Sequence, residues 1–250
     1  MRIIISPAKK MHVDTDSLPV QDLPVFLDDT KVLCRKLQEI AYEQAKALWK
    51  CNDKLTQLNR DRIAHMDLEN GLTPAVLAYE GLQYQHMAPM VFTDQAFSYL
   101  DVHLWILSGF YGVLRPFDGV VPYRLEMQAK LAVGDHRDLY GFWGDRLYRE
   151  LMRENEDGII LNLASKEYAR VAEPYVSPED HMITVVFGEL ADGKVKQKGT
   201  FAKMARGEMV RFLAEHQITD VDEMKQFCAL GLSFQKDLSD EKTMVFAKNE

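Results

Sequence analysis

Residues 107–130, LSGFYGVLRPFDGVVPYRLEMQAK, hold the chain's densest mixture of side chains that could do chemistry. Arg115 and Arg124 supply hydrogen-bond donors. Tyr123 adds a hydroxyl group, and Glu126 adds a carboxylate. Two prolines fix the backbone dihedral φ at their own positions and favour extended backbone in the residue before each. We therefore predict a rigid turn that carries a ligand site. The simpler alternative is a strand–turn–strand unit whose charged residues face water.

A second candidate is ISPAKK at residues 5–10, at the end of the apolar segment 2–5. Polar turns at strand ends are common positions for ligand-binding residues. Lys9 and Lys10 could therefore meet a phosphate or an acidic group, with Ser6 beside them. A solvated turn is the competing explanation, and the residues alone favour neither.

A third candidate is the basic segment 198–211. It contains four basic residues and one acidic residue, whereas the whole chain has a formal net charge of −8. Lys203, Arg206 and Arg211 share a broad flank of the helix predicted here, which indicates a local anion-binding face. A solvated helix face is the common alternative. Gly207 in mid-helix costs about 1 kcal/mol relative to alanine, which suggests that another backbone or a ligand comes close to it.

Two further segments could contact a nucleotide or a nucleic acid. CNDKL at 51–55 separates two predicted helices, and the N–H groups that begin the second helix, together with Lys54, could hold a phosphate. LNLASKEY at 161–168 ends a buried strand, so Asn162, Ser165 and Lys166 could reach a cleft at its carboxyl end. An ordinary helix corner and simple helix capping are the competing explanations.

These groups must be positioned by a mixture of strands and helices. Apolar runs and alternation predict extended segments at 2–5, 76–79, 82–84, 123–131, 159–163, 181–189, 194–200, 227–234 and 243–247. Apolar residues at helical spacing predict helices at about 25–49, from about 55, and at about 94–104, 138–154, 166–173 and 201–216. Asn52 or Asp53, and Thr93, are the expected N-caps, and Asp192-Gly193 is the expected hairpin turn.

The order of these elements predicts the fold class. Strands and helices do not alternate as a regular βαβ repeat, so neither a doubly wound sheet nor a TIM barrel is favoured. We predict a single α+β domain over residues 1–250, with a mixed β-sheet surrounded by helices. Within 123–131, alternation places Arg124 and Glu126 on one face and Tyr123 on the other, towards the core.

Composition narrows the classes of function. Hydrophobic residues make up 47% and charged residues 27% of the 250 residues, as in ordinary globular proteins. We predict a cytoplasmic protein without a membrane span, because neither a signal peptide nor a long apolar run is present. Three widely spaced cysteines fit a reducing compartment. No dinucleotide, Walker A, nucleophile-elbow or zincin motif occurs, so we predict neither a cofactor nor a metal site.

Six motifs together resemble a known family. ISPAKK, CNDKL, LSGFYGVLRPFDGVVPYRLEM, LYGFWGD, LNLASKEY and FAKMARGEMVRF follow one another as in the YaaA family of bacterial peroxide-stress proteins. The resemblance covers about residues 1–247. It implies a cytoplasmic protein that helps cells to survive hydrogen peroxide and keeps unbound iron low, which limits damage to DNA.

The same resemblance implies structural features. These are a compact mixed α/β fold, a helix-hairpin-helix element at about Glu43–His65 and a positively charged cleft suited to DNA. The serine that this family usually carries before Asn/Asp-Lys is absent here, where Cys51-Asn52 precedes Asp53-Lys54. The residues that fall in matching motifs, and are the candidates for binding DNA, are Lys9, Lys54, Arg115, Arg124, Lys203 and Arg206.

Two hypotheses of different classes follow. The first is a non-catalytic protein that binds DNA phosphates with little sequence specificity. The second is an enzyme that acts on a nucleobase, a nucleotide or damaged DNA. Its pocket would be lined by Ser6, Lys9, Tyr111, Tyr123 and Glu126. Glu126 could act as general acid or base, and Lys9 or Arg115 could bind a phosphate. Direct iron storage is a weaker third option.

Overall fold

The computed structural model describes residues 1–191 and 193–249. Its strands are β1 (Arg2–Ile5), β2 (Lys10–Met11), β3 (Thr73–Pro74), β4 (Tyr79–Glu80), β5 (Leu104–Ser108), β6 (Gly112–Leu114), β7 (Gly119–Val120), β8 (Ile159–Asn162), β9 (His181–Ala191), β10 (Lys194–Lys196), β11 (Ser233–Phe234) and β12 (Thr243–Asn249). Its α-helices are α1 (Leu27–Glu39), α2 (Tyr42–Trp49), α3 (Asp53–Ala64), α4 (Ala75–Ala78), α5 (Leu82–Met87), α6 (Asp94–His103), α7 (Leu139–Trp143), α8 (Arg146–Met152), α9 (Lys166–Ala169) and α10 (Gly199–Glu215). Short 3-10 helices cover Pro89–Val91, Glu173–Tyr175, Val221–Gln226, Ala229–Gly231 and Lys236–Leu238.

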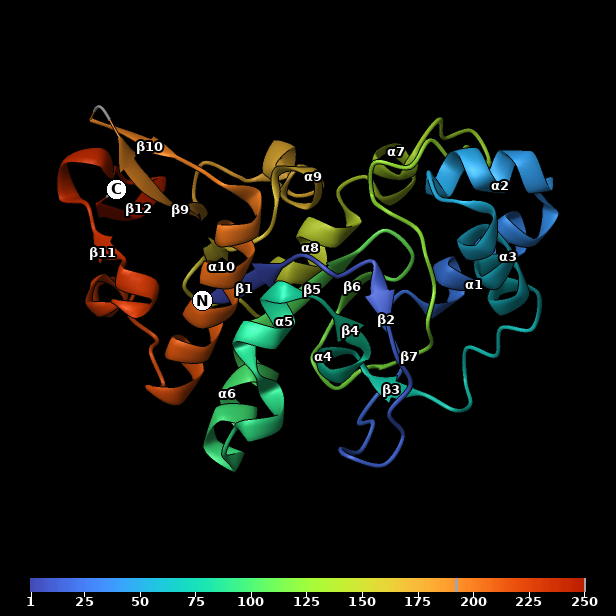
Figure 1. Cartoon of the computed structure of the whole chain (residues 1–250), viewed down its shortest axis with the longest axis horizontal. Coiled ribbons are helices and arrows are strands. Elements are labelled where there is room, and N and C mark those ends of the chain that lie inside the picture. The colour runs from blue at the N-terminus through green and yellow to red at the C-terminus, as the bar shows by residue number, and fades with distance from the viewer. Residues whose placement is uncertain (192, 250) are drawn as a thin grey trace.

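One large mixed sheet organises the molecule, in the order β11-β12-β9-β8-β1-β5-β6, with β10 paired to β9. The five strands from β12 to β5 run parallel to one another. The strands β6, β10 and β11 pair antiparallel. In Figure 1, α1, α2 and α3 gather at the right, whereas β9 to β12 lie at the left. The predicted mixed sheet surrounded by helices is therefore confirmed.

The order of the parallel strands corrects one expectation. Across the sheet, the five parallel strands lie in the order β5, β1, β8, β9, β12. When they are numbered by their order in the chain, this arrangement is 2-1-3-4-5, which is the strand order of doubly wound, flavodoxin-like sheets. A doubly wound sheet was not expected, because the predicted strands and helices show no regular βαβ repeat. The repeat is hidden because six α-helices, one 3-10 helix and three two-residue strands separate β1 from β5.

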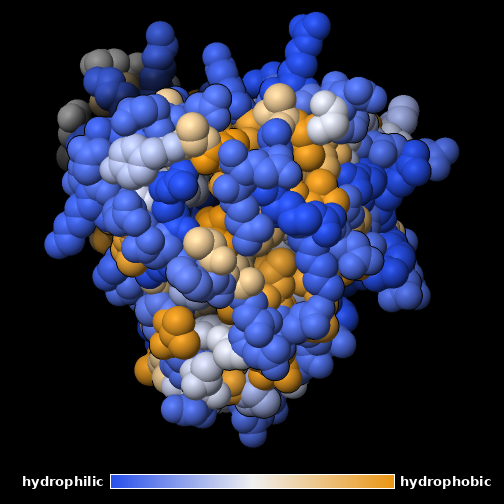
Figure 2. Space-filling view, turned by 90° about the vertical axis from the view of Figure 1, so that its right-hand side faces the viewer, coloured by the Kyte–Doolittle hydropathy of each residue, from blue (hydrophilic) through white to orange (hydrophobic). Residues whose placement is uncertain are grey.

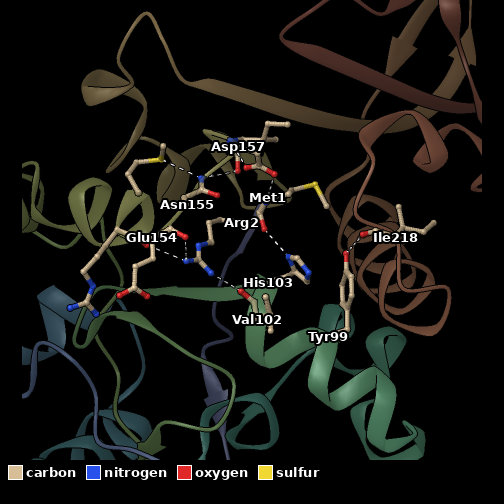
Figure 3. Close-up of polar contacts among 12 residues, drawn as sticks. Met1, Arg2, Tyr99, Val102, His103, Glu154, Asn155, Asp157 and Ile218 are labelled. Atoms are coloured by element: carbon tan, nitrogen blue, oxygen red, sulfur yellow. Dashed lines mark hydrogen bonds and ion pairs between the residues drawn. The ribbon is translucent and has the colours of Figure 1, made fainter.

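The first strand forms the middle of this sheet. Ile3, Ile4 and Ile5 are fully buried, as expected of a parallel strand covered on both faces. Contacts of the first two residues hold the N-terminal end of β1 in place (Figure 3). The amino group of Met1 pairs with Asp157, and the Arg2 guanidinium donates to the carbonyl of Val102 at 2.7 Å. These contacts fix β1 at one end, so its carboxyl end has a defined position.

Several predicted elements are confirmed. The Asn52 side chain caps α3 by accepting the Leu55 N–H at 3.0 Å, and Thr93 caps α6. The strands β9 and β10 form the predicted hairpin, although its turn residue Asp192 lies outside the described residues. The long helices predicted at 25–49 and 138–154 are each divided in two. The second division falls at Gly144, whose φ of 54° a helix cannot contain.

Other predicted elements are wrong. Residues 82–84, expected to be extended, begin α5, and most of 76–79 belongs to α4. Of the strand expected at 227–234, residues 229–231 form a turn of 3-10 helix, and the strand β11 covers Ser233–Phe234. The segment 123–131 joins no sheet, although its side chains alternate between buried and more exposed as predicted. Its backbone instead lies against the β5–β6 turn, where a Cβ on Gly109 would be 2.5 Å from the carbonyl oxygen of Leu125.

The close approach suspected at Gly207 is made by a protein backbone. A Cβ at this position of α10 would lie 2.1 Å from the carbonyl oxygen of Gln83 in α5. The glycine therefore lets the two helices pack backbone to backbone. Among the described residues, no helix is both long and apolar enough to cross a membrane.

Candidate functional site

The carboxyl ends of β1 and β8 meet at a polar junction. The N–H of Ser165 donates to Ser6 Oγ at 2.8 Å, and Ser6 Oγ donates to Ser165 Oγ at 3.3 Å. The strand order reverses at this junction, since the chain passes from β1 to β5 on one side and then to β8 on the other. In open α/β sheets, ligands bind outside the carboxyl ends of the strands at such a switch point.

A pocket of about 470 Å³ opens at this junction, and we call it the switch-point pocket. Five separate segments line it: 6–10, 80–84, 123–126, 165–168 and the flank of α10 that carries Lys203 and Arg206. The volume is in the usual range for small-molecule sites.

A second pocket of about 630 Å³ adjoins the first, and we call it the helical-corner pocket. It lies between the α1–α2 side and residues 126–132, and it shares Lys9 and Glu126 with the switch-point pocket. Its wall includes Leu48 and Trp49, and its cations include Lys50. On the face that carries α1, α2 and α3, hydrophobic side chains lie deeper than the hydrophilic ones around them (Figure 2).

The two pockets meet at Lys9 and Glu126 and have a strong excess of positive charge in their lining. We call them together the basic cleft. Its eight basic lining residues are Lys9, Lys10, Lys36, Lys50, Arg124, Lys130, Lys203 and Arg206. Its three acidic lining residues are Glu80, Glu126 and Glu167. The net charge of the chain is −8, so this concentration of cations makes the cleft electrostatically unlike the rest of the protein.

A carboxylate sits between two cations where the pockets meet. Glu126 Oε1 lies 3.2 Å from Lys9 Nζ and 3.3 Å from a terminal nitrogen of Arg124. The same Arg124 nitrogen donates to the carbonyl of Trp49 at 3.2 Å. The side chain of Glu126 is 12% exposed and that of Lys9 66% exposed. The arrangement offers a buried carboxylate beside a solvent-accessible ammonium group.

Arg206 is a half-buried cation without a protein partner. Burial lowers the pKa of its guanidinium, which nevertheless remains charged. Within residues 1–191 and 193–249 it makes no ion pair, and its Nε is buried without a hydrogen-bond acceptor. Leaving a buried charge uncompensated is costly, so this position favours an anion supplied from outside.

Glu167 gives the switch-point pocket a second carboxyl group of different character. Its Oε1 accepts the Gln128 N–H at 3.2 Å. Burial raises the pKa of Glu167, and the nearby charge of Glu126 raises it further. Two carboxyl groups in different environments can divide the roles of proton donor and proton acceptor.

Tyrosines form a rigid floor under the switch-point pocket. Tyr84 donates its hydroxyl proton to the carbonyl of Ser6 at 3.0 Å. The Tyr123 hydroxyl lies 2.9 Å from the Tyr79 hydroxyl and 2.6 Å from Ser108 Oγ. Burial raises the pKa of Tyr123 to about 12, so it stays neutral. This network ties the β1 turn, the β4–α5 segment and residues 108 and 123 together.

The structure brings most of the predicted site residues into the basic cleft. Those that line it are Ser6, Lys9, Tyr123, Arg124, Glu126, Lys203 and Arg206. Tyr123 also belongs to the core, as the alternation of its segment predicted. These residues come from three motifs that lie far apart in the sequence.

Several predicted residues line neither pocket: Arg115, Tyr111, Lys54, Asn162, Lys166 and Arg211. Arg115 follows β6, and because β6 runs antiparallel to β5, Arg115 lies at the opposite end of the sheet. Its guanidinium carbon lies 5.7 Å from the ring centre of Trp105. Tyr111 is 1% exposed, and its hydroxyl accepts the Val121 N–H. Lys54 is exposed on the first turn of α3 and lines neither pocket.

The predicted helix-hairpin-helix region contains two helices, α2 and α3, separated by residues 50–52. Lys50 has a left-handed backbone with φ of 45° and lines the helical-corner pocket. The corner thus borders the cleft through Lys50 in place of Lys54. Its action as a DNA-binding element stays a prediction.

Sequence reasoning missed several lining residues. Gln83 was assigned to an extended segment, although it lies on α5. Glu167 was passed over although it belongs to a motif already singled out, LNLASKEY, and its place after a buried strand was the available signal. Lys36 and Lys130 carry no local signal, because only packing of α1 beside residues 128–132 makes them neighbours. The described residues contain no group of three or more metal-ligating side chains.

These features define an α/β protein with a switch-point site inside a basic cleft. A family model described as peroxide stress protein YaaA matches residues 1–238, and the chain belongs to this family. The UPF0246 protein of Pediococcus pentosaceus is 52% identical over 250 residues, which cover 100% of this chain and 99% of that protein. The UPF0246 protein of Agathobacter rectalis is 53% identical over 248 residues, 99% of each chain. The resemblance inferred from the six motifs is thereby confirmed, and the family supports a role in peroxide stress.

Proposed function

We propose that this peroxide stress protein binds DNA in the basic cleft, with little sequence specificity. The observation that carries the proposal is the lining of eight cations against three carboxylates in a chain of net charge −8. Among the described residues, Lys50, Lys130, Lys203 and Arg206 have no carboxylate partner, so they can neutralise phosphates.

The arrangement of these cations supports the proposal. The cleft runs from α10, which carries Lys203 and Arg206, to the α2–α3 corner, which carries Lys50. Contacts of this kind to phosphates fix position without reading bases. DNA held in this way in the cytoplasm would be shielded from damage driven by unbound iron. This shielding is the proposed link between the protein and iron, and it requires no iron ligand.

The test removes two cations from one wall of the cleft. We expect Lys203→Gln combined with Arg206→Gln to weaken duplex binding about 10- to 100-fold at low salt, and to reduce the slope of log K against log salt by about 2. Fluorescence anisotropy with a labelled duplex across a salt series would measure both quantities.

The matched control removes the same charge elsewhere. Arg211→Gln combined with Lys225→Gln neutralises two exposed cations, one of them on α10, that lie outside the cleft and pair with Glu215 and Asp222. We expect less than a threefold change in affinity for this control. Equal losses in the two double variants would contradict binding in the cleft.

A second candidate is an enzyme that acts on a nucleotide, a nucleobase or damaged DNA. It is favoured by Glu126 held beside Lys9 and Arg124, and by the raised pKa of Glu167 in the same pocket. One carboxyl group could accept a proton while the other donates one.

Measurements of substrate turnover and of duplex binding distinguish the enzyme from the DNA-binding protein. If the protein turns over such a substrate, we expect Glu126→Gln to lower the rate by about 100-fold or more while duplex affinity changes little. Glu80→Gln, another pocket carboxylate but one paired with the exposed Lys10, is the control. Product analysis by chromatography would measure turnover, and a fully active Glu126→Gln would remove Glu126 from the chemistry.

A further inference from the structure

Buried polar atoms without partners concentrate in the switch-point pocket. Seven such side-chain atoms occur among the described residues. Three of them are nitrogen atoms of residues that line this pocket: Gln83 Nε2, Arg124 Nε and Arg206 Nε. A fourth, Glu126 Oε1, makes no hydrogen bond but lies within ion-pair distance of Lys9 and Arg124. A buried donor without an acceptor destabilises the fold, so such a cluster favours a ligand that completes it.

The close packing of α5 on α10 puts two of these donors on one wall. The backbone of Gln83 touches α10 at Gly207, next to Arg206. Gln83 is 6% exposed, so water does not replace the missing acceptor of its side chain freely. Lys203 lies one helical turn before Arg206 on the same wall. The unpartnered amide of Gln83 and the two cations Lys203 and Arg206, placed at a switch point, together form a site for a compact oxyanion.

From this juxtaposition we propose that the switch-point pocket binds the phosphate monoester of a single nucleotide. Arg206, Gln83 and Lys203 hold the phosphate, while Glu126 faces the pocket as the acceptor for a hydroxyl or amino group of the nucleoside. A phosphate monoester fits better than a backbone diester, because the monoester carries a second negative charge and this wall carries two cations, Lys203 and Arg206. The pocket volume of about 470 Å³ is sufficient for one nucleotide unit.

The inference rests on the proposed function in one respect: both assume that the basic cleft binds nucleotides or nucleic acids. A phosphate monoester of this kind occurs on a free mononucleotide and on a phosphorylated DNA end. Both present the same group to Arg206, and the experiment has one arm for each.

The first arm is calorimetry with deoxyadenosine monophosphate, deoxyadenosine and inorganic phosphate. We expect the monophosphate to bind at least about 30-fold more tightly than deoxyadenosine, since only the former engages the cations. Arg206→Gln should weaken the monophosphate about 30- to 100-fold, and Gln83→Met about 5- to 10-fold, whereas Arg211→Gln should have no effect. Gln83→Met keeps the volume of the side chain, so it tests the site even if Arg206→Gln folds poorly.

The second arm compares duplexes with a 5′-phosphate and a 5′-hydroxyl end. Tighter binding of the phosphorylated end, lost in Arg206→Gln and displaced by deoxyadenosine monophosphate, identifies a strand end as the ligand. Monophosphate binding without this preference identifies a free nucleotide. Equal affinity for deoxyadenosine and its monophosphate, or full monophosphate affinity in both Arg206→Gln and Gln83→Met, would overturn the inference. Duplex binding that persists in that case leaves the proposed DNA function standing.

Discussion

Gly207→Ala is expected to destabilise the protein by about 2–4 kcal/mol, although glycine-to-alanine changes in helices normally stabilise by about 1 kcal/mol. The reversal arises because the added Cβ would lie 2.1 Å from the Gln83 carbonyl oxygen and 2.8 Å from the Met87 nitrogen. Both are backbone atoms, which cannot rotate away. Denaturant unfolding followed by circular dichroism would measure the difference.

The same helix provides the control. Gly199 begins α10, and a Cβ there would meet nothing within 4 Å. Gly199→Ala should therefore leave stability unchanged or raise it slightly. A neutral Gly207→Ala would mean that α5 and α10 separate without cost. Because Gly207 sets the distance between Arg206 and Gln83, we also expect Gly207→Ala to weaken binding of anionic ligands in the folded fraction.

Asp118→Asn is expected to stabilise the protein by on the order of 3 kcal/mol at pH 8, with little effect near pH 4. Asp118 is 3% exposed, and burial raises its pKa to about 7, assisted by the charges of Asp22 and Asp101 against the opposing influence of Arg115. Its Oδ2 accepts the Arg115 N–H at 2.8 Å. Asparagine keeps an acceptor for that bond without the buried charge.

The direction of the pH dependence follows from proton binding. The folded-state pKa of Asp118 lies above its unfolded value of 3.8, so the folded state binds more protons between about pH 4 and pH 7. Its contribution to stability is present below this window and is lost as the pH rises through it. Denaturant unfolding at several pH values should show this fall in the parent protein and its loss in Asp118→Asn. An unchanged slope would show that Asp118 ionises normally. Asp237→Asn, on the surface, controls for the loss of a carboxylate.

Local pattern was reliable where local physics decides structure. The apolar run 2–5 forms β1, and the side chains of Asn52 and Thr93 cap the helices expected to follow them. The alternation in 123–131 correctly divided buried from more exposed side chains, but the segment joins no sheet. Alternation reports that one face is buried, and any extended segment lying over a core satisfies it.

The sequence by itself determined the family, the mixed α/β content, and the polar turns that carry Ser6, Lys9 and the Arg124–Glu126 pair. Their residue types and order are written in short motifs. Only the tertiary structure decided which of them share a site. The antiparallel pairing of β6 carries Arg115 away from the cleft, although it lies nine residues before Arg124 in the same motif. The parallel alignment of β1 with β8 and the contact at Gly207 bring Ser165, Gln83 and Arg206 together instead. Strand direction and helix contact join residues distant in sequence, and no local pattern encodes them.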